Sequence, residues 1–198
     1  AAQIDKPVVE ASLVIDGLNV STTPGQVGRR LNVDATLVYL TVQMQSFRDG
    51  EVPLVIQEQS PEVLDAAPQA EAARRLLSGP FTLSIPNVRA GDPGPWQIQP
   101  LELAPMLRVG RIYDAAGNAQ YVVKPDRAML KPILETIARQ TDRPEENARF
   151  IFNEETLQLE LIRAATIGYK LDFLGTLDEI EAAVAAGQNA AYLRLNIT

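Results

Sequence analysis

Apolar residues recur at helical spacing in two stretches, one in each half of the chain. The stripes are Val33, Leu37, Leu40 and Met44, and Phe173, Leu177, Ile180 and Val184. Apolar side chains at intervals of three and four residues share one face of an α-helix, so each stripe predicts an amphipathic helix. Gly50 and Gly187 are expected to end the two helices, which makes the first helix about one turn longer.

The two predicted helices have the same surroundings. Residues 28–37 and 168–177 share a glycine, a leucine, a threonine and a second leucine at matching positions. Each stretch follows a predicted β-hairpin and precedes a predicted strand. These segments are residues 11–15, 18–22 and 52–58 in the first copy, and residues 149–153, 157–162 and 192–197 in the second. One structural unit is therefore repeated in tandem.

The middle of the chain completes only the second copy. Its pattern predicts helices at residues 65–78, 100–107 and 126–140, and strands at 81–85, 96–98, 108–113 and 121–124. Pro132 predicts a kink or a break into two helices. Residues 61–198 then form a complete unit and residues 1–60 the back half of another. The expected fold is α+β, with tandem units of β-hairpin, helix and strand, and with helices packed on small, mostly antiparallel sheets. A half unit cannot bury its own apolar face, so we expect it to dock on the complete unit or pair with another chain.

The composition limits the reactions that this chain can catalyse and the ligands that it can bind. The 198 residues contain no cysteine and no histidine, which excludes disulfides, thiolate nucleophiles and Ser-His-Asp or Cys-His catalysis within them. The net charge of −7 argues against nucleic acid as a partner, because nucleic acid requires basic patches. Adjacent acidic residues such as Glu154-Glu155 do not face each other across a cleft, and there is no Asp-rich calcium loop. We therefore expect no metal, no cofactor and no enzymatic activity.

The order of these motifs resembles a known family. Residues 143–148, the hairpin after them, residues 168–177 and Gly187 follow the pattern of the YoaR-like peptidoglycan-binding domain, and residues 28–37 are similar to it as well. The resemblance covers nearly the whole chain. It implies a bacterial, extracytoplasmic module, in the cell wall or anchored to the membrane, with peptidoglycan as its partner. In that family the module lies upstream of VanW or L,D-transpeptidase domains, so such a domain is the neighbour that the resemblance implies.

Five residues are candidates for contact with a glycan or its peptide. An aromatic ring can stack on the apolar face of a sugar, and an arginine can bind a carboxylate through two hydrogen bonds. The candidates are Trp96, Tyr113, Tyr121, Arg108 and Arg111. The structural alternatives are that the tryptophan fills the core of the complete unit and that the arginines are ordinary exposed strand residues.

Other residues of the repeated motif also have structural interpretations. Gly28 and Gly168 suit a turn with positive φ, with close approach of the backbone to a glycan as the alternative. Asn32 and Asp172 are expected to cap the helices. Thr176 and the glutamate three residues after it resemble a capping box.

Two functions of different classes are compatible with these observations. The first is a non-catalytic envelope module that binds peptidoglycan or positions a neighbouring catalytic domain against it. The alternative is a structural spacer or oligomerisation module without glycan binding, including a homodimer formed through residues 1–60. A hydrolase that relies on carboxylates alone is a third hypothesis.

Overall fold

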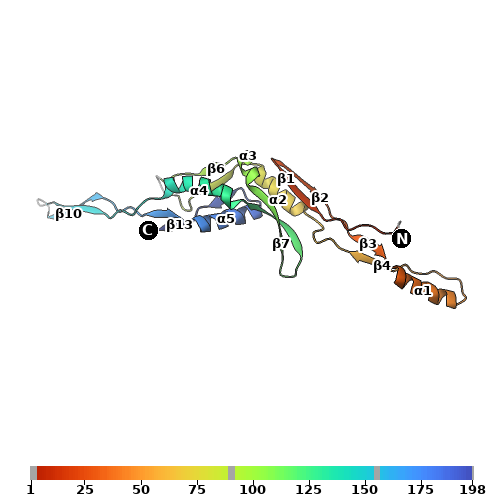
Figure 1. Cartoon of the computed structure of the whole chain (residues 1–198). Coiled ribbons are helices and arrows are strands. Elements are labelled where there is room, and N and C mark those ends of the chain that lie inside the picture. The colour runs from red at the N-terminus through yellow and green to blue at the C-terminus, as the bar shows by residue number, and fades with distance from the viewer. Residues whose placement is uncertain (1–3, 89–91, 154–156, 198) are drawn as a thin grey trace. The chain divides into compact units, whose positions relative to one another are not determined.

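The computed structural model describes residues 4–88, 92–153 and 157–197 (Figure 1). Contacts divide the chain into two compact units. The first unit consists of Ala1–Glu71 and Val109–Val122, and the second of Ala72–Arg108 and Val123–Thr198. Helices alternate with short strands that pair in small, mostly antiparallel sheets, which confirms the α+β class.

The first unit consists of strand pairs, one complete helix and the start of a second. Its elements are β1 (Ser12–Asp16), β2 (Asn19–Thr23), β3 (Gly28–Leu31), α1 (Val33–Gln45), β4 (Ile56–Gln59), the start of α2 (Ala67–Leu77) and the outer parts of β7 (Leu107–Tyr113) and β8 (Ala119–Pro125). β1 and β2 form the predicted hairpin, with Gly17 in its turn at φ 56°. β3 and β4 also pair antiparallel, and α1 lies between them in the sequence.

The second unit has a larger core. Its elements are the rest of α2, β5 (Phe81–Ser84), β6 (Trp96–Ile98), α3 (Pro100–Leu103), the 3-10 turn η1 (Ala104–Met106), α4 (Arg127–Thr141), β9 (Arg149–Asn153), β10 (Gln158–Arg163), β11 (Tyr169–Leu171), α5 (Phe173–Ala185), β12 (Ala190–Tyr192) and β13 (Leu195–Ile197). β5 is the central strand of a sheet, with β12 parallel on one side and β6 antiparallel on the other. Phe81, Leu134 and Ile180 are completely buried in this unit.

The two back halves repeat the same hydrogen bond before each helix. Asp5 Oδ1 accepts from the Leu31 amide at 2.8 Å, and Asp142 Oδ1 accepts from the Leu171 amide at 2.7 Å. Each aspartate thereby fixes the strand that leads into the helix. The register of β3 with β4 likewise matches that of β11 with β13.

The same correspondence continues after each helix. Thr36 Oγ1 accepts from the Val55 amide at 3.1 Å, and Thr176 Oγ1 accepts from the Arg194 amide at 2.9 Å. A threonine in the first helical turn thus ties down the returning chain in both copies. The predicted tandem repeat of hairpin, helix and strand is confirmed at the level of individual contacts.

The helix starts follow the predictions only in part. Asn32 and Asp172 are confirmed as caps, because their Oδ1 atoms accept from the amides of residues 35 and 175. The predicted capping box at Thr176 is wrong, because this residue lies inside the first turn and its hydroxyl oxygen faces the returning strand. Gly28 does not have positive φ. A Cβ there would lie 2.6 Å from Val8 Cγ2, so glycine is required for close packing.

The predicted difference in helix length is also wrong. α1 and α5 both contain 13 residues. The left-handed position after each helix is taken by Phe47 at φ 50° and by Gly187 at φ 67°. Position 47 has no glycine to mark the end of α1, so the end predicted at Gly50 lies too far along the chain.

Three further boundaries differ from expectation. α4 continues as one helix through Pro132, so the predicted break into two helices does not occur. The predicted strand at 192–197 divides into β12 and β13, which pair in different sheets. The first-copy strand predicted from residue 52 begins at Ile56. The predicted turn at residues 154–156 lies outside the described residues.

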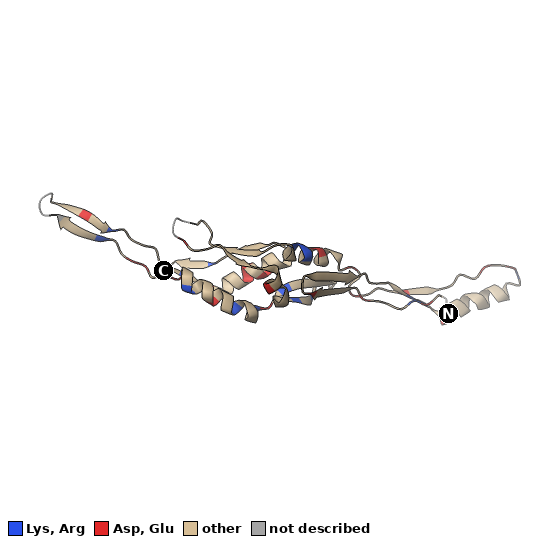
Figure 2. Cartoon of the chain, turned by 90° about the horizontal axis from the view of Figure 1, so that it is seen from above, with Lys and Arg blue, Asp and Glu red and all other residues tan. Residues whose placement is uncertain are grey.

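α1 and α5 differ sharply in burial. α1 has no buried side chain in the described structure, and Leu40 and Met44 are 40% and 69% exposed. α5 buries its matching positions, with Ile180 at 0% and Val184 at 1% exposed. α1 carries almost no charge either, and Figure 2 shows it nearly uncoloured.

Candidate ligand-binding site

Three of the five predicted site residues lie together in the first unit, on the outer part of the β7–β8 hairpin. The Arg111 guanidinium donates to Glu62 Oε2 at 2.5 Å, and the Tyr113 hydroxyl donates to the same oxygen at 3.3 Å. The Arg111 guanidinium also lies over the Tyr121 ring, 5.7 Å from its centroid. The Tyr121 hydroxyl donates to the Ala11 carbonyl at 2.8 Å. These side chains form one polar cluster between the hairpin and the segment after β4.

The electrostatics of this cluster favour its charged forms. Interaction with the hydroxyls of Tyr121 and Tyr113, and then with the Glu62 carboxylate, raises the pKa of Arg111 above its ordinary value. Nearby, the amides of Val63 and Glu62 donate to the Glu10 carboxylate and hold the pKa of Glu10 below its usual range. Arg111 and Glu10 therefore both keep their charges through the neutral range.

The other two predicted residues belong to the second unit. Trp96 is half-buried at the start of β6, and its Nε1 donates to Gln140 Oε1 at 2.7 Å. Arg108 donates to the Pro105 carbonyl at 2.7 Å and forms an ion pair with Asp126 at 3.2 Å. Both side chains therefore already have intramolecular partners.

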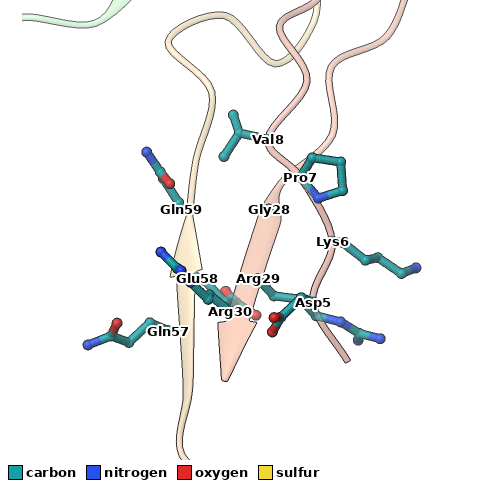
Figure 3. A pocket seen from close by; sticks show the side chains of 10 residues that line it. All are labelled: Asp5, Lys6, Pro7, Val8, Gly28, Arg29, Arg30, Gln57, Glu58 and Gln59. Carbon is teal, nitrogen blue, oxygen red and sulfur yellow. The ribbon is translucent and has the colours of Figure 1, made fainter. Parts of the chain in front are cut away.

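A groove in the first unit was not anticipated from the sequence. It has a volume of about 720 Å³ and lies across the segment before β1 together with β3 and β4 (Figure 3). Its lining residues are Asp5, Lys6, Pro7, Val8, Gly28, Arg29, Arg30, Gln57, Glu58 and Gln59. The Arg29 Nε donates to the Ile4 carbonyl at 2.8 Å, which fixes one wall.

The groove offers hydrogen-bond donors for an acidic or amide-rich ligand. Lys6 and Arg30 are exposed and form no ion pair with any of the described residues. Gln57 and Gln59 add amides that can both donate and accept. Such a polar, open groove suits an extended peptide or sugar chain better than a compact apolar molecule.

The matching region of the second copy is more closed. Tyr169 takes the position of Arg29, and the Arg143 guanidinium stacks over its ring at 4.6 Å. Arg143 also forms an ion pair with Asp92 at 3.5 Å. A smaller hollow of about 210 Å³ borders Tyr169 and Ile197 of this region, and its other walls come from elsewhere in the second unit, among them Ile85, Pro86 and Asp92. The first copy has Arg29 and Arg30 where the second has Tyr169 and Lys170, but the sequence does not show that β4 lies beside them.

Residues 4–88, 92–153 and 157–197 contain no cluster of acidic side chains that could hold a metal ion. Over the same ranges, no helix is both long enough and apolar enough to cross a membrane.

A repeated α+β unit with an open, polar groove is typical of a binding module. The chain belongs to the family described as "Putative peptidoglycan binding domain", whose model matches residues 1–46 and 105–192, about two thirds of its length. The match falls in two segments, as expected for tandem copies, and confirms the resemblance found in the sequence. Family membership implies a cell-wall context. Comparison with curated proteins and with solved structures gives no significant match.

Proposed function

We propose that the chain is a non-catalytic module of the cell envelope that binds peptidoglycan and holds a neighbouring VanW or L,D-transpeptidase domain against it. Membership of the peptidoglycan-binding family is the observation that carries this proposal. The absence of cysteine and histidine supports a non-catalytic role for these residues.

The groove of the first unit is the proposed main contact. Peptidoglycan stem peptides carry carboxylates and amides, which Lys6, Arg30 and the glutamines of β4 can bind through charge-assisted and neutral hydrogen bonds. Trp96, Tyr113, Tyr121, Arg108 and Arg111 are proposed as additional contacts. Of these, the exposed Tyr113 ring is the best placed to stack on a sugar, since it is 61% exposed.

Sedimentation with purified sacculi at low salt tests the proposal. The wild-type protein is expected to pellet with the sacculi, and Arg30→Gln to lower its apparent affinity roughly fivefold to tenfold because one charged donor is lost. Arg48→Gln makes the same charge change on an exposed side chain outside the groove and should bind like the wild type. Wild-type protein that stays in the supernatant would overturn the proposal.

A second candidate function is a spacer or oligomerisation module without glycan binding. The exposed apolar surface of α1 favours it, since Val38 and Val42 are 63% and 61% exposed on a helix with a single charged residue. Two copies of the chain could bury this surface by packing α1 against α1 in a two-fold homodimer.

Light scattering over a range of concentrations tests this candidate. A dimer mass that Val38→Lys converts to a monomer mass would support it, whereas Leu174→Lys on α5, 69% exposed, should leave the mass unchanged. A monomer at every concentration would contradict the homodimer.

A further inference from the structure

One face of the β9–β10 hairpin is apolar and uncovered. Phe150 lies opposite Leu161, and Phe152 lies opposite Leu159, so the four side chains share one face of the ribbon. They are 55%, 56%, 53% and 68% exposed, in that order. A two-stranded ribbon is only marginally stable in water unless its apolar face is covered. The exposed face of β9–β10 is therefore a candidate binding surface.

The matching hairpin of the first copy, β1–β2, has its apolar face covered. Leu13 and Val20 correspond to Phe150 and Leu159 in the two registers, and they are only 7% and 6% exposed. The segment after β4 lies in the same unit, and its Val63 side chain is 2% exposed. The same kind of surface is therefore buried in one copy and bare in the other.

The hydrogen bonds at the base of β1–β2 show which segments lie against it. The Ala11 amide donates to the Val63 carbonyl at 2.9 Å, and the Gly25 amide donates to the Leu64 carbonyl at 2.8 Å. The Tyr121 hydroxyl from β8 donates to the Ala11 carbonyl at 2.8 Å. An extended segment and a tyrosine-bearing hairpin thus hold β1–β2 together.

The second copy presents the same donors without these acceptors. Isolated bridges align the two bases, Val9 with Gln26 in the first copy and Glu146 with Thr166 in the second. By this alignment Ala148 corresponds to Ala11, and Ala165 corresponds to Gly25. In the part of the chain that the structure describes, the amides of Ala148 and Ala165 have no acceptor.

We infer that the β9–β10 hairpin is the docking face for the leading part of another repeat unit, joined head to tail. The partner would contribute an extended segment like residues 62–64 at the hairpin base and a tyrosine-bearing hairpin like residues 109–122. The contact seen within the first unit supplies the pattern for this one. The partner segment must lie slightly farther from Ala165 than residues 62–64 lie from Gly25, where a Cβ would be 2.9 Å from the Val63 carbonyl oxygen. The inference concerns the joining of units and does not depend on glycan binding.

Two alternatives are less well supported by the structure. The matching surface of a second, identical molecule is already taken by its own β1–β2 hairpin. Two β9–β10 faces could pack on each other, but four half-exposed side chains offer far less than the ~800 Å² per partner of a stable interface. A further unit provides both the main-chain acceptors and the apolar cover.

Hydrogen exchange of two proteins tests the inference. One is the chain itself, and the other carries a second copy of residues 60–198 after Thr198, with Ile151→Val in that copy so that its peptides differ in mass. In the chain itself, amides of β9–β10 should exchange at least tenfold faster than those of β1–β2. In the extended protein, the first β9–β10 hairpin should slow by at least tenfold.

Variants in the first β9–β10 hairpin separate docking from a general effect. Phe152→Ser should abolish the gain in protection, whereas Ile151→Ser, on the opposite face of the same strand, should keep it. An unchanged exchange rate in the extended protein, with the added α5 as protected as the original, would overturn the inference. So would protection of β9–β10 in the chain alone that rises with protein concentration.

A variant of the chain itself makes the test independent of the added unit. Val63→Lys should expose β1–β2 and raise its exchange at least tenfold, to that of β9–β10. Leu64→Lys alters a neighbouring side chain that is 50% exposed and should have little effect. Slow exchange of β1–β2 in the Val63→Lys protein would show that this cover does not protect the hairpin, and would overturn the inference.

Discussion

α1 and α5 have the same backbone and opposite surroundings. Both begin at a capped Asn or Asp, contain 13 residues and end at a left-handed residue. α5 packs beside α4 and β12 and buries Ile180 and Val184 of its apolar stripe, whereas α1 buries none of its side chains among the described residues. The local sequence therefore specifies the helix, and the contacts around it decide whether the helix contributes to stability.

The sequence differences between α1 and α5 support the same conclusion. Asp178 and Glu181 on the outer face of α5 form ion pairs with Arg127. Their counterparts in α1 are Val38 and Thr41, which cannot form ion pairs. α1 therefore lacks the charged outer face of α5, a pattern typical of a helix that is covered on more than one side.

Core truncation should give the largest difference between the copies. Ile180→Ala removes a completely buried side chain and is expected to lower the free energy of unfolding by about 2–5 kcal/mol. The matching residue of α1, Leu40, has a side chain that is 40% exposed. Leu40→Ala should therefore lower the free energy of unfolding by less than about 1 kcal/mol. Urea denaturation measures both. Equal losses would mean that α1 is covered in solution.

The left-handed residues should give the next largest effect. Gly187→Ala places a Cβ 2.8 Å from Ala72 Cα in a backbone that disfavours side chains, so it should cost about 2–4 kcal/mol. Phe47→Gly, at the matching position, should instead stabilise the protein by about 0.5–1 kcal/mol. Thermal unfolding of both variants checks the opposite signs. A loss of stability in Phe47→Gly would indicate that the phenylalanine ring has a packing partner.

The paired threonines should differ more modestly. Thr176→Val removes the acceptor of the Arg194 amide at a completely buried site and should cost about 1–3 kcal/mol. Thr36→Val makes the same change at a half-buried site, where water can replace the lost acceptor, and should cost about half as much. Chemical denaturation of the two single variants and of the double variant measures the difference and its additivity.

Lowering the pH should give the smallest difference in stability between the two copies. Hydrogen bonds from Arg127, and then from Lys124, hold the pKa of Glu181 below its ordinary value of 4.5. A lowered folded pKa contributes stability above the unfolded value, and this is lost as the pH falls through the folded value. Glu181→Gln should cost about 0.5 kcal/mol at neutral pH and flatten the loss of stability below pH 4.5. Thr41→Val in α1 should leave that acid limb unchanged.

The sequence predicted the repeated elements well because each depends on local signals. The Asp16-Gly17 turn, the caps at Asn32 and Asp172 and the apolar stripes all act within a few residues. The end of α1 was misplaced because Phe47 adopts a conformation that favours glycine. Phe150 and Leu13 both read as ordinary strand residues, although one is exposed and the other buried. Burial depends on distant segments, which a single sequence does not reveal.

The candidate site was harder to predict for the same reason. Arg111, Tyr113 and Tyr121 lie near one another in the sequence and do form a cluster, but its central acceptor, Glu62, lies about fifty residues away. The groove combines three segments that are distant in sequence, so neither Arg30 nor Gln57 carried a local signal of it.

The contact between β1–β2 and the segment after β4 is made largely by main-chain atoms. Amides of Ala11 and Gly25 meet carbonyls of Val63 and Leu64, and these groups are present whatever side chains the positions carry. The hydrogen bonds themselves do not depend on the side chains at positions 11, 63 and 64, whereas Gly25 is constrained because a Cβ there would lie 2.9 Å from the Val63 carbonyl oxygen. The reach of a chain assembled from such units would then be set by the number of units.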